Sequence, residues 1–410
     1  MAQRILIGIG GGIAAYKVCE IISALVKSGS EVRVMLTGAA QAFVTPLTVT
    51  TLCRHPVYDD ASLWEATHQR PLHIELADWA DLMLLAPLTA NTLAKLACGL
   101  ADNLLSNTVL ASDCPILLAP AMNTTMWQQP AVQRNWRQIL QEARYHVIGP
   151  GAGLLACDTV GLGRMAEPQD ILSYLSSLEY TKGCRDLVDK TLLISAGGTR
   201  EPLDPVRFIG NPSTGKMGMA LALAAWHRGA KVSLVHAPLS EIFSPVADIN
   251  KIATPTSAEM RSQLLNLFPT ADWTIMAAAV GDVKPAQYSA TKLPKKDLPQ
   301  SLALEPVPDI LAELSQLKQP RQRLIGFAAQ TGDIVTPAQE KLKRKGLDAI
   351  ATNPVDQPHS GFGSHQNQAV LIDKTGRQVE VPNCSKLSMA HQLLDFIVEL
   401  DQRLVHHPAP

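Results

Sequence analysis

The sequence predicts an α/β protein with two Rossmann-like three-layer α/β/α domains, each built on a mainly parallel sheet. Three observations support this fold class. Apolar runs of strand length alternate with stretches of helical periodicity, as in parallel sheets whose two faces are buried. The pattern starts again halfway along the chain, at KTLLISAGG (residues 190–198). The length of 410 residues also exceeds what one hydrophobic core usually accommodates.

The N-terminal half begins with a strand-like run, RILIGI (residues 4–9). Apolar residues then recur three or four positions apart over residues 13–28, which predicts a helix, and Gly29 suits its C-terminal end. Residues 31–37 (EVRVMLT) predict a second strand. Further strands are expected at DLMLLAP from Asp81, PILLAPAM from Pro115 and HVIGPG from His146.

The C-terminal half repeats this order. A helical stretch from Gly215 leads into WHRGAKVSLVHA, which echoes LVKSGSEVRVMLT in the first half. Strands are predicted at WTIMAAAV, LIGFAAQ and DAIATN, and KTGR between QAVLID and RQVEV predicts a hairpin. A helix from about Ser385 to Leu404 closes the chain. Because the apolar periodicity fades over residues 176–189, we expect domains at 1–189 and 190–410.

Composition and charge argue against several classes of protein. The net charge of −1 creates no overall field that would attract nucleic acid or an anionic membrane. No apolar run approaches the ~20 residues of a membrane-spanning helix. MAQRILIGIG lacks the layout of a signal peptide, and the seven cysteines contain no CxxC pair. We therefore expect a cytoplasmic protein with no nucleic-acid or membrane partner and no metal-ligating cluster.

Two glycine-rich loops indicate phosphate binding. The loop from Gly8 lacks dinucleotide spacing, because Ile13 stands where the third glycine belongs, and the second strand ends in Thr37 rather than an acid. Exposed N–H groups at a helix start favour a mononucleotide phosphate, and a tight turn without a ligand is the alternative. Residues 210–216 resemble a P-loop, but Met217 replaces the hydroxyl residue that binds magnesium.

Longer strings are more specific. The first half contains HIEL from His73, APLTANTLAKLACGLADNLL from Ala86, PAMNTTMW from Pro120 and ACDTVGLGRM from Ala156. These strings resemble the flavin-dependent cysteine decarboxylases. The second half contains SAGGTREPLDPVRFIGNPSTGKMG from Ser195, AAAVGDV from Ala277, GFAAQT from Gly326 and EKLKRKGLDAIATN from Glu340. These resemble phosphopantothenate–cysteine ligase. In this order, over nearly the full length, the chain resembles the bacterial bifunctional enzymes of coenzyme A biosynthesis.

The resemblance implies that the first half binds FMN and decarboxylates phosphopantothenoylcysteine to 4'-phosphopantetheine. It makes His73 the proton acceptor, Asn123 the amide that holds the substrate carboxylate and Cys157 the proton donor. Without the resemblance, these residues would be interpreted as a core histidine, an Asx turn and an inert thiol. Asn103 is expected to cap a helix, with a ligand contact as the alternative. The implied FMN-binding residues are Gly11, Gly12, Ile13, Thr37, Thr89, Ala90, Asn91, Thr92 and Ala121.

The resemblance also implies that the second half joins cysteine to 4'-phosphopantothenate through an acyl-cytidylate, using CTP and Mg2+ (or Mn2+). Lys292 is then needed to form the acyl-nucleotide and Asn211 to turn it over, while Arg207 and Asn211 bind substrate. The basic run KLKRK by itself is more typical of a solvated helix face. The implied nucleotide-binding residues are Asp282, Lys292, Val307, Pro308, Asp309, Ile310, Phe327, Lys341 and Lys345.

Three positions depart from the family pattern. Gly10 stands where a hydroxyl residue is usual, Asp158-Thr159 replaces Gly-Asp after Cys157, and Val307 replaces an asparagine. The Asp158 carboxylate would raise the pKa of the neighbouring thiol by charge repulsion, and a changed mobility of the loop is the alternative. The loss of the asparagine amide leaves the choice between CTP and ATP open.

The resemblance implies a homo-oligomer, in which flavin-domain trimers group into a dodecamer and ligase domains pair as dimers. Two other functions stay open. One is a flavin-binding regulatory protein without catalysis. The other is a decarboxylase of C-terminal cysteine in a peptide, with a degenerate ligase half.

Overall fold

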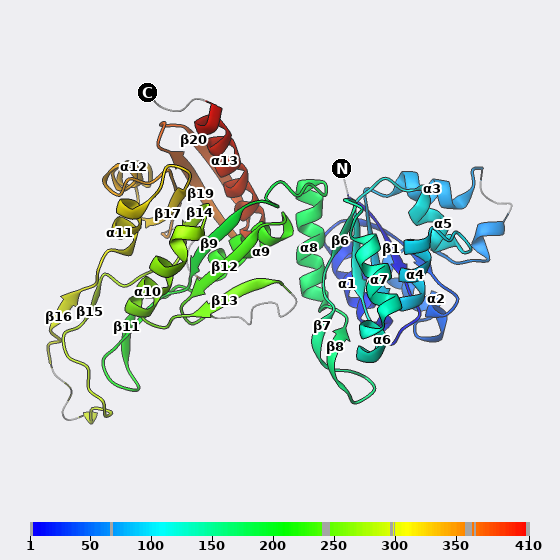
Figure 1. Cartoon of the computed structure of the whole chain (residues 1–410), viewed down its shortest axis with the longest axis horizontal. Helices are drawn as coiled ribbons and strands as arrows, with labels where there is room; N and C mark the ends of the chain where they lie inside the picture. The colour runs from blue at the N-terminus through cyan, green and yellow to red at the C-terminus, as the bar shows by residue number, and fades with distance from the viewer. Residues whose placement is uncertain are drawn as a thin grey trace. The chain divides into compact units, whose positions relative to one another are not determined.

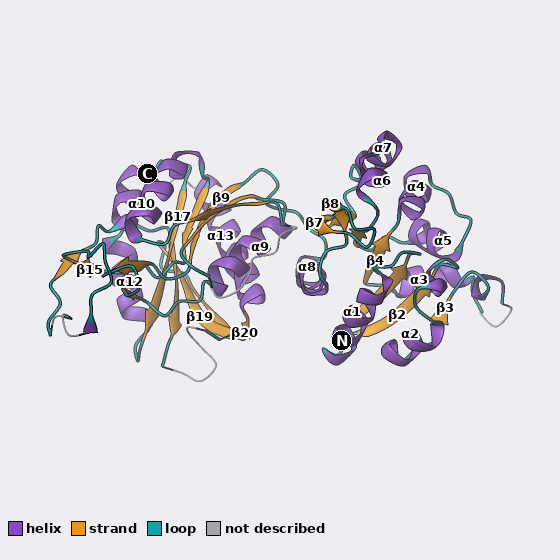
Figure 2. Ribbon diagram, turned by 90° about the horizontal axis from the view of Figure 1, so that it is seen from below, coloured by secondary structure: helices purple, strands orange, loops and turns teal. Residues whose placement is uncertain are grey.

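The computed structural model describes residues 3–65, 69–239, 247–295, 298, 300–356, 363–364 and 366–406. The chain forms two compact units that divide between Cys184 and Arg185 (Figure 1). Each unit has a mainly parallel sheet at its centre, with helices on both faces (Figure 2). This arrangement confirms the predicted fold class. The division at residues 189 and 190 stays a prediction.

The first unit contains a six-stranded parallel sheet with the order β3-β2-β1-β4-β5-β6. Its strands are β1 (Arg4–Ile9), β2 (Glu31–Leu36), β3 (Val57–Tyr58), β4 (Leu82–Leu88), β5 (Ile116–Pro120) and β6 (Tyr145–Val147). Ile5 of the central strand pairs with Val32 on one side and Leu82 on the other. The order in which successive strands are added to the sheet reverses between β1 and β4. Open α/β sheets bind ligands at such a point.

The helices of this unit form the outer layers. They are α1 (Ala15–Lys27), α2 (Pro46–Cys53), α3 (Leu72–Trp79), α4 (Ala90–Cys98), α5 (Leu104–Ala111), α6 (Thr124–Gln128), α7 (Pro130–Ile139) and α8 (Pro168–Thr181). Helices α3, α4, α5 and α7 share one core with the sheet, where Leu76 and Leu93 pack with Met83 and Leu85. Helices α1 and α8 contact each other outside that core.

A hairpin that was not predicted projects from this unit. It consists of β7 (Gly151–Leu154) and β8 (Val160–Arg164), and β8 packs against α6. The backbone N–H of Met122 donates to the carbonyl of Gly163 at 2.9 Å. A Cβ on Gly163 would lie 2.1 Å from the carbonyl oxygen of Met122. Glycine is therefore needed for the hairpin to dock on the segment that precedes α6.

The second unit contains an eight-stranded sheet with the order β13-β12-β9-β14-β17-β18-β19-β20. The first six strands are parallel, and β19 and β20 form the predicted antiparallel hairpin. The strands are β9 (Thr191–Ala196), β12 (Lys231–His236), β13 (Ile249–Ala253), β14 (Trp273–Met276), β17 (Arg323–Gln330), β18 (Ala349–Pro354), β19 (Gln366–Asp373) and β20 (Gln378–Ser385).

Among the described residues of this unit, five helices cover the second sheet. They are α9 (Lys216–His227), α10 (Ser257–Leu267), α11 (Ile310–Leu317), α12 (Val335–Arg344) and α13 (Lys386–His406). Leu264 of α10, Leu314 of α11 and Leu342 of α12 share a core with Leu193 and Leu324 of the sheet. Helices α9 and α13 pack against each other.

Short elements complete the two units. Two small antiparallel ladders pair β10 (Arg200–Pro202) with β11 (Phe208–Gly210), and β15 (Val283–Pro285) with β16 (Leu304–Pro306). Single 3-10 turns are η1 (Ala40–Ala42), η2 (Ser62–Trp64) and η3 (Phe268–Thr270). Within the described ranges, no helix combines the length and the apolar character that crossing a membrane requires.

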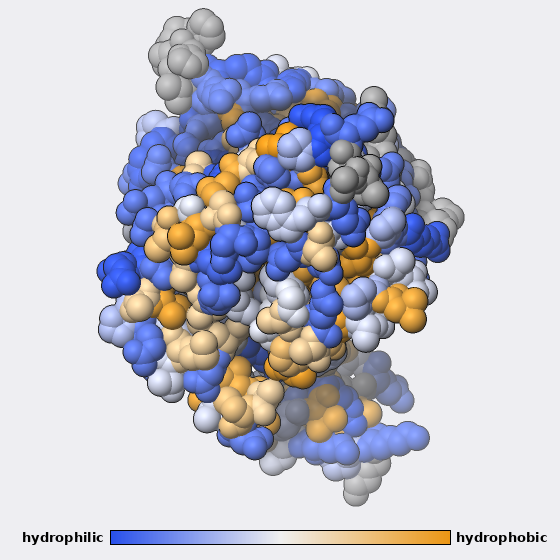
Figure 3. All heavy atoms as spheres, turned by 90° about the vertical axis from the view of Figure 1, so that its right-hand side faces the viewer, coloured by the Kyte–Doolittle hydropathy of each residue, from blue (hydrophilic) through white to orange (hydrophobic). Residues whose placement is uncertain are grey.

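Figure 3 shows one face of the first unit, where hydrophobic residues gather in small groups among hydrophilic ones. Large apolar side chains that this unit exposes include Ile13, Tyr16, Leu47 and Trp64. Single exposed apolar side chains are ordinary on protein surfaces. The predicted homo-oligomer therefore stays a prediction.

Candidate active sites

The glycine run of the first unit turns tightly from β1 into α1. The carbonyl of Gly10 accepts from the N–H of Gly12 at 3.1 Å, and the carbonyl of Gly12 accepts from Ala15 at 2.9 Å. A Cβ on Gly11 would lie 2.3 Å from the Cβ of Ala39, whereas a Cβ on Gly12 would meet nothing closer than 3.8 Å. Packing therefore requires glycine at position 11, while Gly12 leaves open space at the start of α1.

Gly10 has a structural explanation. A Cβ at this position would lie 2.4 Å from the carbonyl oxygen of Pro87 and 3.1 Å from Cγ2 of Thr89. The loop after β4 thus occupies the volume that a serine or threonine would need. The hydroxyl that the family pattern leads us to expect has no room in this arrangement.

The loops after β1, β2 and β4 meet at the carboxyl edge of the sheet. The Thr37 hydroxyl donates to the carbonyl of Ile9 at 3.2 Å. The Thr89 hydroxyl caps α4 by accepting from the N–H of Thr92 at 3.2 Å. The N–H of Ala121 donates to the end of β4 at 3.0 Å, which brings the segment after β5 to the same edge. The predicted FMN-binding residues lie on these segments: Gly11, Gly12, Ile13, Thr37, Thr89, Ala90, Asn91, Thr92 and Ala121.

Two predicted catalytic residues of the first unit are in contact. Asn123 caps α6, because its Oδ1 accepts from the N–H of Thr125 at 2.8 Å. Its Nδ2 donates to Sγ of Cys157 at 3.2 Å. Cys157 is exposed in the loop that joins β7 to β8, and its Sγ also lies 3.1 Å from Oγ1 of Thr159 in a hydrogen bond. The Asx turn and the contact with the thiol are thus two roles of one amide.

These contacts change the acidity of the thiol. The hydrogen bond with Thr159 is the largest cause that lowers the pKa of Cys157 below its ordinary value, and the amide of Asn123 adds to it. The expectation that Asp158 raises this pKa is therefore wrong. Hydrogen bonds to the sulfur determine the direction of the shift.

The third predicted residue, His73, lies in the first turn of α3 and is half-buried. Its Nδ1 is buried and has no hydrogen-bond partner among the described residues. The nitrogen thus lacks the carbonyl partner that the core-histidine alternative requires. Within the same part of the chain, His73 forms no hydrogen bond with Asn123 or Cys157. Asn103 caps α5 through a capping box, which is the structural role predicted for it.

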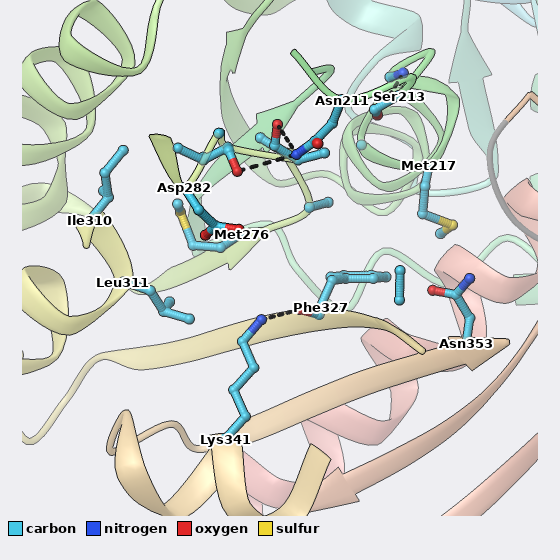
Figure 4. A pocket seen from close by; sticks show the side chains of 18 of the residues that line it. Asn211, Ser213, Met217, Met276, Asp282, Ile310, Leu311, Phe327, Lys341 and Asn353 are labelled. Atoms are coloured by element: carbon cyan, nitrogen blue, oxygen red, sulfur yellow. Dashed lines mark hydrogen bonds between the residues drawn. The ribbon is translucent and has the colours of Figure 1, made fainter. Parts of the chain in front are cut away.

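The second unit has a cavity of about 660 Å³ (Figure 4). It lies at the carboxyl edge of the sheet, beside β14 and β17 and next to the reversal of strand order between β9 and β14. Nine predicted site residues line it: Asn211, Asp282, Val307, Pro308, Asp309, Ile310, Phe327, Lys341 and Lys345. The motifs that are far apart in sequence therefore converge on one space.

Asn211 and the start of α9 form one wall of this cavity. Nδ2 of Asn211 donates to the carbonyl oxygens of Ala279 at 3.5 Å and Val280 at 3.3 Å. Gly215 precedes the helix with a φ of +77°, and its Cβ would lie 2.3 Å from the side chain of Leu239. The N-terminus of α9, with Lys216, thus lines the cavity, and helix N-termini favour anions.

The opposite wall carries the basic run. Nζ of Lys341 donates to the carbonyl of Phe327 at 2.8 Å. Burial lowers the pKa of the Lys341 ammonium, and the Asp282 carboxylate opposes this shift. Lys345 pairs with Asp309, which also caps α11. Lys341 and Lys345 line the cavity, so the solvated-face interpretation of KLKRK does not hold for them.

Arg207 and Lys292 lie outside the residues that line the cavity. Nη1 of Arg207 donates to the Asp204 carboxylate at 2.7 Å and to the carbonyl of Leu293 at 3.1 Å. Asp204 also accepts from the N–H of Leu293 at 3.2 Å. This network ties the segment that carries the exposed Lys292 to the DPVR stretch.

Sequence reasoning named no site role for seven polar residues of the cavity wall: Ser213, Thr214, Lys216, Arg344, Asn353, Asn367 and Lys386. Lys216 follows a glycine-rich loop, and Arg344 belongs to the same basic run, so both had a local signal. Asn353 lies near the end of β18, Asn367 near the start of β19 and Lys386 at the start of α13, directly after β20. These segments meet only through the strand order. Asn367 and Lys386 are buried.

Comparisons with known proteins follow the same division of the chain. Residues 1–178 match the Flavoprotein family, and residues 187–400 match the family of DNA/pantothenate metabolism flavoprotein C-terminal domains. The chain is 41% identical over 401 residues to the coenzyme A biosynthesis bifunctional protein CoaBC of Bacillus subtilis (strain 168), covering 98% of both chains.

Two further relatives have similar identity. The CoaBC protein of Vibrio cholerae serotype O1 is 41% identical over 399 residues, which cover 97% of this chain and 98% of that protein. A cysteine/cysteine sulfinic acid decarboxylase from an unknown prokaryotic organism is 42% identical over 341 residues, which cover 81% of this chain and 92% of that relative.

Proposed function

The chain belongs to the family of bifunctional coenzyme A biosynthesis proteins CoaBC, and on this basis we propose roles for its individual residues. Its first half is a phosphopantothenoylcysteine decarboxylase and its second half a phosphopantothenate–cysteine ligase. One observation supports the residue assignments above all. Motif residues from separate segments converge within each unit, at the Asn123–Cys157 contact and around the cavity.

We propose that FMN binds at the carboxyl edge of the first sheet. The open space beside Gly12, the start of α1 and the hydroxyls of Thr37 and Thr89 suit a phosphate and a ribityl chain. Nδ1 of His73 and Oγ1 of Thr124 are buried without a partner among the described residues, and a ligand can satisfy such atoms. When bound, FMN supplies the oxidation of the substrate thiol that makes loss of CO2 possible, and it returns the electrons afterwards.

The protein side chains bind the substrate and move protons in this step. Asn123 holds the substrate carboxylate. Its Oδ1 accepts from the N–H of Thr125, and this hydrogen bond keeps Nδ2 facing Cys157. His73 accepts a proton from the substrate, a role that an imidazole nitrogen can perform. Cys157 donates a proton from Sγ to the carbon that has lost the carboxylate. Its exposed position in the hairpin loop leaves Sγ accessible to a substrate.

In the second unit, the cavity is proposed to bind CTP. Its wall carries five cationic side chains and two carboxylates, which favours a triphosphate. The carboxylate of 4'-phosphopantothenate needs this activation because its own oxygen is a very poor leaving group. Lys292 supports formation of the acyl-nucleotide, Asn211 its turnover and Arg207 substrate binding. Mg2+ or Mn2+ would be held mainly by the phosphates, as is usual for nucleotide-bound magnesium.

Two further proposals rest on family membership. The flavin domains form trimers within a dodecamer while the ligase domains form dimers, and the protein acts in the cytoplasm. Size-exclusion chromatography with light scattering measures the first of these directly. A monomer at micromolar concentration would contradict it.

Purified full-length protein tests the proposed function. It is incubated with 4'-phosphopantothenate, cysteine, Mg2+ and either CTP or ATP, and products are identified by mass spectrometry. We expect 4'-phosphopantetheine, CMP and pyrophosphate with CTP, and a flavin of FMN mass after heat release. Product formation with ATP only would overturn the CTP assignment.

The same incubation separates this function from that of the cysteine decarboxylase relative. Cysteine is supplied without 4'-phosphopantothenate and nucleotide, and the reaction is monitored for cysteamine. We expect none. Cysteamine formation, with no coupling product in the complete mixture, would assign the chain to free cysteine decarboxylation instead.

A further inference from the structure

We propose that Thr159 is a positioning residue for Cys157: its hydroxyl and the amide of Asn123 together hold the sulfur and stabilise the thiolate that proton donation leaves behind. This inference rests on the proposed role of Cys157 as proton donor. It adds a residue that no motif assigns, at a position where the chain departs from the family pattern.

The geometry of the hairpin loop places the hydroxyl against the sulfur. The N–H of Leu155 donates to the carbonyl of Thr159 at 2.8 Å, and the N–H of Asp158 donates to the carbonyl of Leu155 at 3.0 Å. Asp158 adopts a left-handed conformation with a φ of 60°, which reverses the chain within the loop. Oγ1 of Thr159 therefore lies 3.1 Å from Sγ of Cys157, two residues away.

The second contact comes from a separate segment and has a fixed direction. Oδ1 of Asn123 accepts from the N–H of Thr125 at 2.8 Å, so the other end of the amide, Nδ2, is turned toward Cys157. The hairpin is held close to this segment, since a Cβ on Gly161 would lie 2.5 Å from Oγ1 of Thr124. The sulfur thus lies between two hydrogen-bonding groups that the fold holds in place.

The chemistry explains why both groups matter. When Cys157 donates its proton, the S–H bond breaks, a C–H bond forms at the substrate carbon, and the electron pair stays on sulfur. A thiolate accepts hydrogen bonds far better than a thiol does. A hydroxyl and an amide that donate to sulfur therefore stabilise the state after proton transfer, and they make Cys157 a stronger acid.

The charged groups around the hairpin loop are few among the described residues. Asp158 lies in the loop itself, and Arg164 ends β8 and pairs with Glu167 at 2.7 Å. Helix α6, which packs against β8, reads TTMWQ and has no charged side chain. The hydroxyl of Thr159, rather than a formal charge, is thus the group through which the loop sequence acts on the sulfur.

Alkylation of Cys157 by iodoacetamide tests this role in flavin-loaded full-length protein. The rate is measured against pH by peptide mass spectrometry for wild type, Thr159→Val and Thr159→Ser, with the exposed Cys98 and Cys184 as internal references. We expect Thr159→Val to move the Cys157 profile to higher pH and to slow alkylation at neutral pH about three- to tenfold. Thr159→Ser retains the hydroxyl and is expected to restore the wild-type profile.

Asp158→Asn is the matched control, because asparagine also tolerates the left-handed conformation. It is expected to leave the Cys157 profile nearly unchanged. An unchanged profile in Thr159→Val would overturn the inference. An equal shift in Asp158→Asn would also overturn it, since the carboxylate would then govern the thiol.

Steady-state kinetics provide the second measurement. Thr159→Val is expected to lower kcat for formation of 4'-phosphopantetheine about three- to tenfold with little change in KM, because the hydroxyl acts on the proton-transfer step. Its ligase rate is expected to equal that of wild type. A change in KM alone would assign Thr159 to substrate binding and overturn the proposed role. If Cys157→Ser still gave the full yield of 4'-phosphopantetheine, the proton-donor assignment itself would fail.

Discussion

Gly11 and Gly12 are adjacent in the sequence, yet the structure places different demands on them. Gly11 approaches Ala39, with 2.3 Å between an added Cβ and the Cβ of Ala39 and 2.9 Å to its carbonyl carbon. Gly12 faces open space, where the proposed phosphate would bind. Packing thus requires glycine at position 11, whereas at position 12 glycine leaves room for a ligand.

Substitution by alanine is expected to separate these two demands. Gly11→Ala should lower the stability of the first unit by about 1–3 kcal/mol, because the backbone at Ala39 must move. Gly12→Ala should leave Tm near wild type. Thermal unfolding of the first unit, followed by flavin fluorescence and by circular dichroism, measures both. Equal Tm values for the two variants would contradict the packing argument.

The same residues show what local sequence can and cannot reveal. The missing acid after β2 and the wrong glycine spacing were enough to favour a mononucleotide over a dinucleotide. The reason for Gly10, by contrast, is the carbonyl of Pro87, which belongs to another strand. The direction of the Cys157 pKa shift was also misjudged, because it depends on how two side chains point in a folded loop.

Asp348 connects three segments of the second unit through its side chain. It precedes β18, and its buried carboxylate accepts from Lys318 at 2.8 Å, from Lys374 at 2.9 Å and from the N–H of Leu324 at 2.9 Å. These groups lie after α11, in the turn of the β19–β20 hairpin and on β17. Burial alone would raise the pKa of Asp348, but the two lysines and the N–H group lower it below its ordinary value.

Asp348→Asn is expected to lower the free energy of unfolding by roughly 1–3 kcal/mol at pH 7, since the lysines lose a shared anionic partner. The pKa of Asp348 is lower in the folded protein. Its stabilising contribution is therefore fully present above the ordinary value of 3.8 and is lost as the pH falls through the lower folded value. Urea unfolding at pH 7 and at successively lower pH measures this difference.

The exposed Asp248 provides the control for this prediction. Asp248→Asn is expected to leave the unfolding free energy within about 0.5 kcal/mol of wild type at both ends of the pH range. If the effect of Asp348→Asn did not shrink in acid, ionisation of the carboxylate would not be the source of its stabilisation.

Long and short strands differed in how readily the sequence revealed them. The central strands and the β19–β20 hairpin were predicted because buried parallel strands need continuous apolar runs and hairpins need turn residues. The ladders β7–β8, β10–β11 and β15–β16 were missed. Their strands are three to five residues long, and several contain glycine or proline. Such strands are stabilised by what they pair with and pack against rather than by their own pattern.

For the whole molecule, two separate units predict two separable activities. Cys157→Ser should accumulate 4'-phosphopantothenoylcysteine, while Lys341→Met should lose ligation but still decarboxylate that compound when it is supplied. A mixture of the two variants is expected to form 4'-phosphopantetheine, because the intermediate is a small molecule that can leave one site and enter the other. A time course by mass spectrometry measures each product.

The outcome of mixing has a clear alternative. If the mixture accumulated the intermediate and formed no 4'-phosphopantetheine, transfer between sites would have to occur without release into solution. Each variant assayed alone with 4'-phosphopantothenoylcysteine provides the control. It shows that Lys341→Met retains a working decarboxylase and that Cys157→Ser does not.

Local patterns in the chain were sufficient to predict the two α/β halves, the family and most residues of the proposed sites. Apolar periodicity and short motifs depend on neighbours in sequence, and a single sequence contains both. The tertiary structure decided what depends on distant neighbours. It placed Asn123 and Thr159 on the sulfur of Cys157 and brought Asn353, Asn367 and Lys386 to the ligase cavity. Strand order and loop docking set these contacts, since they bring together residues that no spacing along the chain relates.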